Sequence, residues 1–357
     1  MAATILDLPG LVERLSPGDR ARWERIFDVR SSTGALSVPP PMEGWVANRF
    51  GSIEAVTSQQ IVHVMNTVVG EGSLFNPLRA HRPLDAKPLG DVSDEVKRSS
   101  GGPFCTPLDL TPEDPFGRVK GKHCVTASNI AKYDGLHGLI VFDEHDPLHI
   151  SSERVADYID CALAWADRCR QLDPDAKNVL IIWNCLWKGG ASIIHGHAQV
   201  VCSKGLHYAH VEHLRAAAAR YLEAHGADYF DDLSDLQHAL GLGREWRDVR
   251  VLVNLTPIKE REVILFSPTV TDALKEAVFR VLDHHLHKLG TRAFNLAIAI
   301  PPPDDPRWEG FPVVVRLVDR GDPAHPSSDI AAMELYGSSI ITTDPFEVAA
   351  SLFQLFK

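Results

Sequence analysis

The sequence of 357 residues contains no closely spaced pair of cysteines. Its six cysteines are scattered along the chain at Cys105, Cys124, Cys161, Cys169, Cys185 and Cys202. Disulfide frameworks and cysteine-rich zinc modules depend on paired spacings such as Cys-x-x-Cys. The spacing therefore argues against both of these classes.

The N-terminus has neither the basic segment nor the apolar segment of a signal peptide, and it carries Asp7, Glu13 and Asp19 instead. No apolar run approaches the roughly 20 residues that span a bilayer. We therefore expect a cytoplasmic protein that has no membrane partner.

An excess of positive charge is also missing, because 36 Lys and Arg face 47 Asp and Glu, which gives a formal net charge of -11. A field of that sign repels nucleic-acid backbones, so we expect no nucleic-acid partner. Small anionic substrates remain open, since a local group of Arg and Lys can reverse the field inside a cleft. The hydrophobic fraction of 45% is enough for a sizeable core in one large domain or two ordinary ones.

The N-terminal third has an irregular pattern. Residues 6–29 predict one or two short helices, and we take residues 1–50 as a helical N-terminal extension. Short apolar stretches in residues 51–69 predict strands. Residues 85–115 are rich in Pro, Gly, Ser and charge, which predicts a long loop of the kind that often serves function.

A regular pattern follows, in which the order strand, strand, helix, strand, strand occurs twice. The first copy covers residues 123–128, 138–143, a helix after Ser151, 179–183 and 192–202, and the second covers 249–255, 262–266, 271–289, 293–300 and 312–319. Helices at 209–224 and 231–242 separate the copies. The repeated order predicts an α+β fold with tandem duplicated halves, residues 51–205 and 206–357, in antiparallel sheets with packed helices.

The most informative stretch is Asn-Cys-Leu-Trp-Lys-Gly-Gly-Ala-Ser-Ile-Ile-His-Gly-His-Ala-Gln, residues 184–199. Side chains of a strand alternate between its faces, so His195, His197 and Gln199 are predicted to line one face. The glycine turn before them, which includes Gly190 and Ser192, can present backbone N–H groups to a phosphate, and Lys188 adds charge beside it.

Imidazole chemistry indicates a function for this motif. A neutral histidine nitrogen can attack an α-phosphorus to form a phosphoramidate, which divides one displacement into two. His197 is the candidate nucleophile, His195 would orient it or the leaving group, and Gln199 would hydrogen-bond a phosphoryl oxygen. A packed core strand is the plainer alternative. Metal ligation by the two histidines is another, with His145 or Cys105 as candidate third ligands.

Six residues of this stretch resemble the active-site motif of the galactose-1-phosphate uridylyltransferases: Asn184, Gly190, Ser192, His195, His197 and Gln199. That family belongs to the histidine-triad (HIT) superfamily, together with dinucleoside polyphosphate phosphorylases. Residues 75–78 (Phe-Asn-Pro-Leu) and 79–83 (Arg-Ala-His-Arg-Pro) are similar to its N-terminal elements, and Asn129 resembles its nucleotide-contacting Asn.

The resemblance implies a nucleotidyltransferase in which His197 forms the covalent nucleotidyl-enzyme. Arg79 and Arg82 would bind phosphates, and Asn129, Asn184, Lys188, Gly190, Ser192 and Tyr336 would complete the substrate site. The implied substrates are a nucleotide sugar, such as a UDP-sugar, or a dinucleotide, together with a phosphate-bearing acceptor. The implied assembly is a homodimer.

The sequence also departs from the family. Only Cys105 stands where its metal-binding members have a cysteine pair, so a zinc site of His145 and His195 looks incomplete and no resident metal or other cofactor is expected. Residues 314–318 of the second half contain no histidine. Gly337 replaces the carboxylate that follows the Tyr in galactose enzymes, and Ser338 and Ser339 resemble the small-residue segment of the phosphorylase branch. A phosphorylase of dinucleoside polyphosphates or NDP-sugars, and a non-catalytic nucleotide-binding protein, therefore remain as alternatives.

Overall fold

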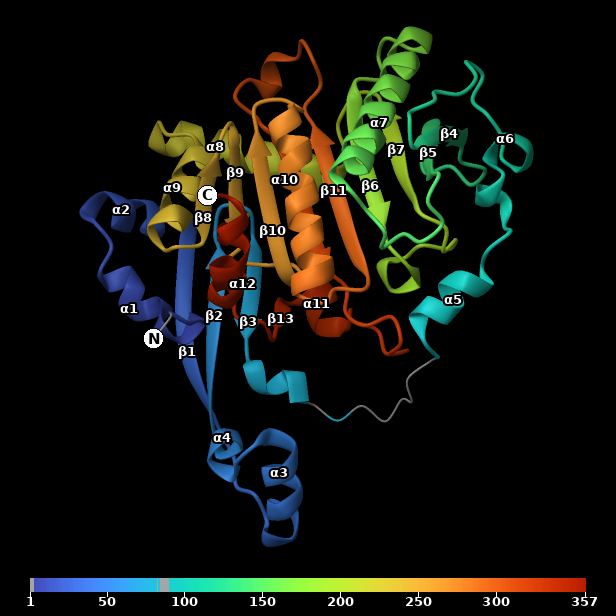
Figure 1. Cartoon of the computed structure of the whole chain (residues 1–357). Coiled ribbons are helices and arrows are strands. Elements are labelled where there is room, and N and C mark those ends of the chain that lie inside the picture. Colours follow the sequence, from blue (N-terminus) through green and yellow to red (C-terminus); the bar gives the residue numbers. More distant parts are fainter. Residues whose placement is uncertain (1–2, 82, 84–89) are drawn as a thin grey trace.

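A nine-stranded antiparallel sheet forms the centre of the molecule (Figure 1), in a computed structural model that describes residues 3–81, 83 and 90–357. Its strands follow the order β4-β5-β7-β6-β11-β12-β10-β9-β8. They are β4 (Cys124–Ser128), β5 (Leu136–Phe142), β6 (Asn178–Asn184), β7 (His197–Ser203), β8 (Gly243–Trp246), β9 (Val249–Val253), β10 (Glu260–Ser267), β11 (Phe294–Ile300) and β12 (Val313–Asp319).

The two copies of the predicted element order lie side by side in this sheet. The first copy contributes β4, β5, β7 and β6, and the second contributes β11, β12, β10 and β9 in the mirrored order. The copies meet at the antiparallel pair β6–β11, where Asn184 lies opposite Asn295. The sequence pattern predicted the order of these elements and their lengths to within a few residues, except that β7 begins at His197 rather than at residue 192.

Each copy places one helix across the sheet, namely α7 (Ser152–Leu172) and α10 (Asp272–Asp283) (Figure 1). Ser151 caps α7 by accepting a hydrogen bond from the Arg154 N–H, and its buried apolar residues recur at helical spacing. Trp165 of α7 packs so closely on Gly138 of β5 that a Cβ there would lie 2.6 Å from the indole. Gly138 pairs with Val200, so α7 lies on the opposite face from His197 and Gln199.

A smaller four-stranded sheet corrects two expectations. It has the order β1-β2-β3-β13, with strands β1 (Phe27–Ala35), β2 (Ser58–Asn66), β3 (Glu71–Phe75) and β13 (Ser339–Ile341). Because β3 and β13 run parallel, not every sheet is antiparallel. Residues 1–50 are also not wholly helical, since α1 (Leu8–Glu13) and α2 (Pro17–Ile26) lead into β1 before α3 (Glu43–Phe50).

The remaining helices are α4 (Ile53–Thr57), α5 (Val92–Arg98), α6 (Pro107–Leu110), α8 (Ala209–His225), α9 (Tyr229–Ala239), α11 (Ala332–Tyr336) and α12 (Pro345–Leu352). The predicted loop at 85–115 therefore contains two short helices in its described part, and Gly101, Gly102 and Pro103 separate them. Within the described ranges, no helix has the length and apolar composition needed to cross a bilayer.

Candidate active site

His197 is the first residue of β7, and its side chain is only 7% exposed. Its Nδ1 lies 2.8 Å from the carbonyl oxygen of His195. A carbonyl can only accept, so Nδ1 carries the hydrogen and Nε2 carries a lone pair. Burial lowers the pKa of His197, which favours this neutral form. Across the described residues, Nε2 makes no hydrogen bond, so this nitrogen is available to attack an electrophile.

His195 serves a different part of the site from the one predicted. It precedes β7, and its Nε2–H donates to the Phe142 carbonyl at 2.8 Å, so its Nδ1 faces Cys105 and His145. The backbone carbonyl of His195, rather than its ring, contacts His197. The ring of His195 lies beside the face that His197 and Gln199 line and is turned toward Cys105 and His145. The ring of Phe104 lies edge-on to both histidines and covers this face.

Cys105, His145 and His195 form a cluster with the chemistry of a metal site. The Nε2–H of His145 donates to the Val96 carbonyl at 2.8 Å, so the Nδ1 atoms of both histidines carry lone pairs, and these atoms are 3.1 Å apart. Cys105 Sγ lies 3.4 and 3.5 Å from them. Two facing lone pairs beside a thiol repel each other unless a cation lies between them, and this donor set suits zinc.

The structure brings together the three candidate ligands that the sequence named, and among the described residues no fourth His, Cys, Asp or Glu joins them. The three candidate ligand atoms lie within 4.8 Å of one another. A cavity of about 470 Å³ opens beside them and is bordered by the cations Lys120 and Lys122. The sequence named these residues as candidate ligands but could not show that they meet, because Cys105 and His195 are 90 residues apart in the chain.

Three amide side chains belong to the predicted site, Gln199 as a catalytic residue and Asn129 and Asn184 as substrate-binding residues. The oxygen of each amide is occupied: Asn129 Oδ1 accepts from the Ala131 N–H, Asn184 Oδ1 accepts from Asn295 Nδ2 at 2.7 Å, and Gln199 Oε1 lies 2.9 Å from His137 Nε2. Ile182 pairs with Gln199, so Asn184, two residues further along β6, lies on the same face near His197. The NH₂ groups of Asn184 and Gln199 are thereby left to face an anion, whereas Asn129 Nδ2 lies 3.2 Å from His137 Nε2.

Two residues that hold these amides were missed by the sequence analysis. His137 of β5 contacts Gln199, and Asn295 of β11 donates both to Asn184 and to the Gly189 carbonyl. Arg320 in turn donates to Asn295 Oδ1 and pairs with Asp329. Only the register between strands brings these residues together. The proximity of His137 to Asn129 in the sequence was the single available signal.

The glycine turn before β7 differs in detail from the predicted phosphate nest. Gly190 adopts a left-handed conformation with φ of 90°, which favours glycine. The N–H groups of Gly190 and Ala191 donate within the turn, to the carbonyls of Trp187 and Leu186. Among the described residues, the N–H groups of residues 192–195 have no acceptor, so the open donors begin at Ser192.

Lys188 is tied to the second half of the chain. Its Nζ donates to the carbonyls of His325 and Ser327, and burial lowers its pKa. Trp187 Nε1 donates to the Pro323 carbonyl at 2.9 Å. These contacts fasten the glycine turn to the loop that follows β12.

The remaining predicted residues lie apart from the histidines. Arg79 is exposed on a short helix at Pro77–His81 that follows β3. Arg82 lies outside the described residues. Tyr336, at the end of α11, is 88% exposed and therefore does not belong to the core. Neither Arg79 nor Tyr336 contacts the His197 motif in the described ranges.

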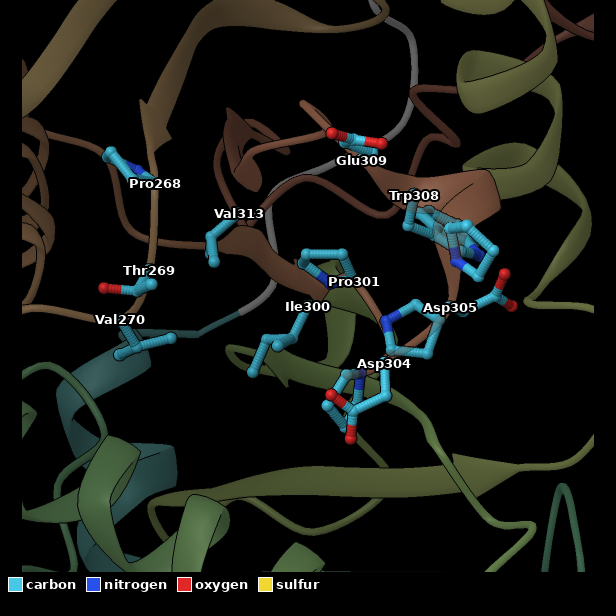
Figure 2. A pocket seen from close by; sticks show the side chains of 13 residues that line it. Pro268, Thr269, Val270, Ile300, Pro301, Asp304, Asp305, Trp308, Glu309 and Val313 are labelled. Atoms are coloured by element: carbon cyan, nitrogen blue, oxygen red, sulfur yellow. The ribbon is translucent and has the colours of Figure 1, made fainter.

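A second hollow, of about 640 Å³, lies in the other half of the large sheet (Figure 2). The loops that follow β10 and β11 enclose it, and these are the counterparts of the loops that carry His145 and His195. Its lining contains prolines, Thr269, Trp308, and the acidic residues Asp304, Asp305 and Glu309. It has no histidine or cysteine, so it lacks the chemistry of the first half.

Comparison with known proteins gives a match in structure alone. No family model matches the sequence, and no curated protein matches it. An ADP-glucose phosphorylase from Arabidopsis thaliana, solved with bound ADP-glucose, is similar with a TM-score of 0.59 and 16% identity over 80% of this chain and 95% of that chain.

Two further solved structures are similar over most of their length. A galt-like protein from Arabidopsis thaliana has a TM-score of 0.57 and 15% identity over 81% of this chain and 97% of that chain. A uridylyltransferase has a TM-score of 0.55 and 16% identity over 69% of this chain and 88% of that chain. The chain therefore shares the fold of these three proteins.

Proposed function

We propose that this chain is a nucleotidyltransferase that moves an NMP group from a nucleoside diphosphate sugar or similar donor to a phosphate-bearing acceptor. The observation that carries the proposal is the state of His197. Its Nδ1–H is held by the His195 carbonyl, and its Nε2 lone pair stands among amide donors suited to a phosphoryl group.

The reaction is a double displacement. In the first step the Nε2 lone pair of His197 attacks the α-phosphorus, a P–N bond forms, and the P–O bond to the β-phosphate breaks. The sugar phosphate leaves with that electron pair. In the second step a phosphate oxygen of the acceptor attacks the same phosphorus and the P–N bond breaks, which returns His197 to its starting form. Nδ1 keeps its hydrogen throughout, and the His195 carbonyl stabilises the charge on the ring.

The surrounding residues bind and orient the substrates in this proposal. The amides of Gln199 and Asn184 donate to oxygens of the transferred phosphoryl group, and Asn129 contacts the nucleotide. The open N–H groups from Ser192 onward hold the departing phosphate, with Gly190 shaping the turn and Lys188 fixing it. Arg79, Arg82 and Tyr336 bind the donor or the acceptor.

We further propose that Cys105, His145 and His195 hold a zinc ion. When bound, zinc would supply a structural link and no reacting group. It would join the segment after α5 to His195, whose carbonyl orients His197. The second-half hollow holds no comparable ligand set, so one ion per chain is expected.

The proposal also assigns different functions to the two halves of the chain. Residues 51–205 would form the catalytic half and residues 206–357 a substrate-binding half, related by an internal duplication. The matching element orders of the two copies support this division.

A phosphorylase is the second candidate, favoured by one specific residue. Gly337 stands where a carboxylate would bind sugar hydroxyls in a galactose enzyme, so selection for a hexose phosphate loses a partner. The same covalent intermediate would then be resolved by inorganic phosphate. A nucleotide-binding protein without turnover is disfavoured, because binding alone needs no unpaired imidazole nitrogen.

The test is intact-protein mass measurement after incubation with UDP-glucose, ADP-glucose and a dinucleoside polyphosphate in separate reactions. We expect one NMP adduct with the correct donor, and its loss in the variant His197→Asn. Adding galactose 1-phosphate or inorganic phosphate should then discharge the adduct and distinguish transferase from phosphorylase. No adduct with any donor, or an adduct that survives in His197→Asn, would contradict the proposal.

A further inference from the structure

His137 is fully buried at the start of β5, beside the amide of Gln199. Its Nδ1 accepts a hydrogen bond of 2.9 Å from the backbone N–H of Tyr133. Nδ1 therefore has no hydrogen, and Nε2 of the neutral ring must carry it. The Nε2–H donates to Gln199 Oε1 at 2.9 Å. Burial lowers the pKa of His137, which favours the same neutral tautomer.

The hydrogen bond from His137 decides which way the Gln199 amide faces. An amide can rotate by about 180° and exchange the positions of its oxygen and its NH₂ group, with little change in packing. With the oxygen fixed on His137, the NH₂ group faces away from β5. Without that donor, the amide oxygen can turn toward a phosphoryl oxygen, and two acceptors would then face each other.

The loop between β4 and β5 holds His137 in place from the outside. The ring of Tyr133 stacks on the imidazole with centroids 4.5 Å apart. Lys132 Nζ donates to the His137 carbonyl at 3.1 Å and to Ser128 Oγ at 2.7 Å. Asn129 begins the same loop, and its N–H donates to the His137 carbonyl. One loop therefore sets both the orientation of Gln199 and the position of Asn129.

We propose that His137 is a positioning residue, which fixes the Gln199 amide with its N–H groups directed at the transferred phosphoryl group. This inference rests on the proposed function, since Gln199 needs an orientation only if it meets a phosphate. His137 itself does not touch the substrate in this proposal, so its effect passes through the side chains beside its Nε2. Gln199 Oε1 lies 2.9 Å from that atom and accepts its hydrogen, whereas Asn129 Nδ2 lies further away, at 3.2 Å.

A double-mutant cycle tests this dependence. His137→Phe keeps an aromatic ring against Tyr133 but removes the donor, and Gln199→Ala removes the amide. We expect each change to lower kcat for transfer by about 10- to 100-fold with little change in donor KM. The double variant should be no slower than Gln199→Ala alone. The proposal would be overturned if the losses of the two single variants multiplied in the double variant. Full activity in a folded His137→Phe variant would overturn it as well.

His207 provides a matched control outside the proposed site. It is buried, and its Nδ1 accepts from the Tyr208 N–H at 2.8 Å, as the Nδ1 of His137 does from Tyr133. Its Nε2 has no hydrogen-bond partner among the described residues. His207→Phe therefore removes a similar buried imidazole without disturbing an amide, and should leave kcat for transfer unchanged. An equal loss in this control would mean that the effect of His137→Phe is general.

A second measurement needs no His137 variant and no activity. Nitrogen NMR of the protein labelled at histidine should show His137 with bare Nδ1 and protonated Nε2, and Gln199→Ala should shift the Nε2 signal. The opposite tautomer, or an unmoved signal, would overturn the proposal. Failure of the wild-type protein to form any NMP adduct would instead contradict the proposed function, while these signals would still decide the contact between His137 and Gln199.

Discussion

Two strands of the large sheet, β7 and β12, occupy corresponding places in the two halves but differ in chemistry. Strand β7 carries His197 and Gln199 on the face away from α7 and α10. Gln199 pairs with Ile182, Ile182 pairs with Ala297, and Ala297 pairs with Arg316 of β12. Residues that pair directly across neighbouring strands point to the same face of the sheet, so Arg316 lies on the same face as Gln199. There its guanidinium is held by Glu71 and Glu262.

The difference shows that the same face of the sheet can carry open polar groups in one half and a paired ion cluster in the other. In the first half, neutral groups leave N–H donors and an imidazole nitrogen open. In the second half, a charged residue is fully paired and joins the small sheet to the large one through Glu71 of β3. An open donor can serve chemistry, whereas a satisfied ion pair serves assembly.

The largest expected effect comes from breaking the chemistry of the first half. His197→Asn removes the nucleophile and should lower transfer by about 10⁴-fold or more, with little change in melting temperature. The rate is measured with the best donor from the adduct screen. A rescue sharpens the result, because His197→Gly opens a gap that a nucleoside phosphorimidazolide can fill as a donor. Transfer within tenfold of wild type in His197→Asn would contradict the assignment.

The corresponding change in the second half should affect stability instead. Arg316→Met leaves the fully buried Glu262 carboxylate without its cation, which typically costs about 3 kcal/mol. Urea unfolding measures the loss, and the folded fraction should still transfer at close to the wild-type rate. If Arg316→Met left stability unchanged, or lowered transfer without lowering stability, the proposed difference between the two halves would be wrong.

Removing the metal ligand set should have an intermediate effect. Cys105→Ser should reduce bound zinc from about one ion per chain to near zero, and lower transfer by about tenfold through misplacement of the His195 carbonyl. Elemental analysis of the purified protein gives the zinc content. Cys161→Ser, in α7 away from the cluster, is the control and should keep its zinc. Equal zinc in both variants would exclude the cluster as the binding site.

Acid should destabilise the chain, because neutral histidines are buried in both halves. Burial lowers the pKa of His207 and His285, and it lowers the pKa of His284 to about 4. Unfolded histidines titrate near 6.5, so below that value the unfolded chain binds more protons than the folded one. The free energy of unfolding, measured in urea, should therefore be level above about pH 7 and fall as the pH drops from about 6.5 toward 5. Constant stability across that window would contradict the burial of these neutral rings.

The smallest effect is expected in the second-half hollow of Figure 2. Glu309 is exposed at its rim, so Glu309→Gln should change stability by less than about 0.5 kcal/mol and leave transfer unchanged. Adduct formation and urea unfolding of the same preparation give both quantities. A clear loss of transfer would mean that this hollow takes part in the reaction.

The sequence predicted the elements of the large sheet because each has a strong local signal. Alternating or continuous apolar runs mark β5 and β6, and helical spacing after a serine cap marks α7. The parallel pairing of β3 with β13 joins residues more than 260 positions apart in the chain. No local pattern encodes such a pairing, so the small sheet could not be predicted.

The residues of the candidate site were also predictable only where they lie close together in the sequence. His197 and Gln199 were found because they lie two residues apart in one motif. The partners His137 and Asn295 were missed because strand register, not spacing, brings them to Gln199 and Asn184. His195 precedes the regular strand, which begins at His197, so the alternation of strand side chains could not predict that its ring meets Cys105 and His145.

The most direct test of the account is to determine which nitrogen of His197 carries the nucleotide. The adduct formed by the correct donor is prepared from protein labelled with ¹⁵N at histidine, and phosphorus and nitrogen NMR locate the P–N bond. Because the His195 carbonyl holds Nδ1–H at 2.8 Å, the account predicts a bond to Nε2 of His197. A bond to Nδ1, or to any other residue, would contradict it.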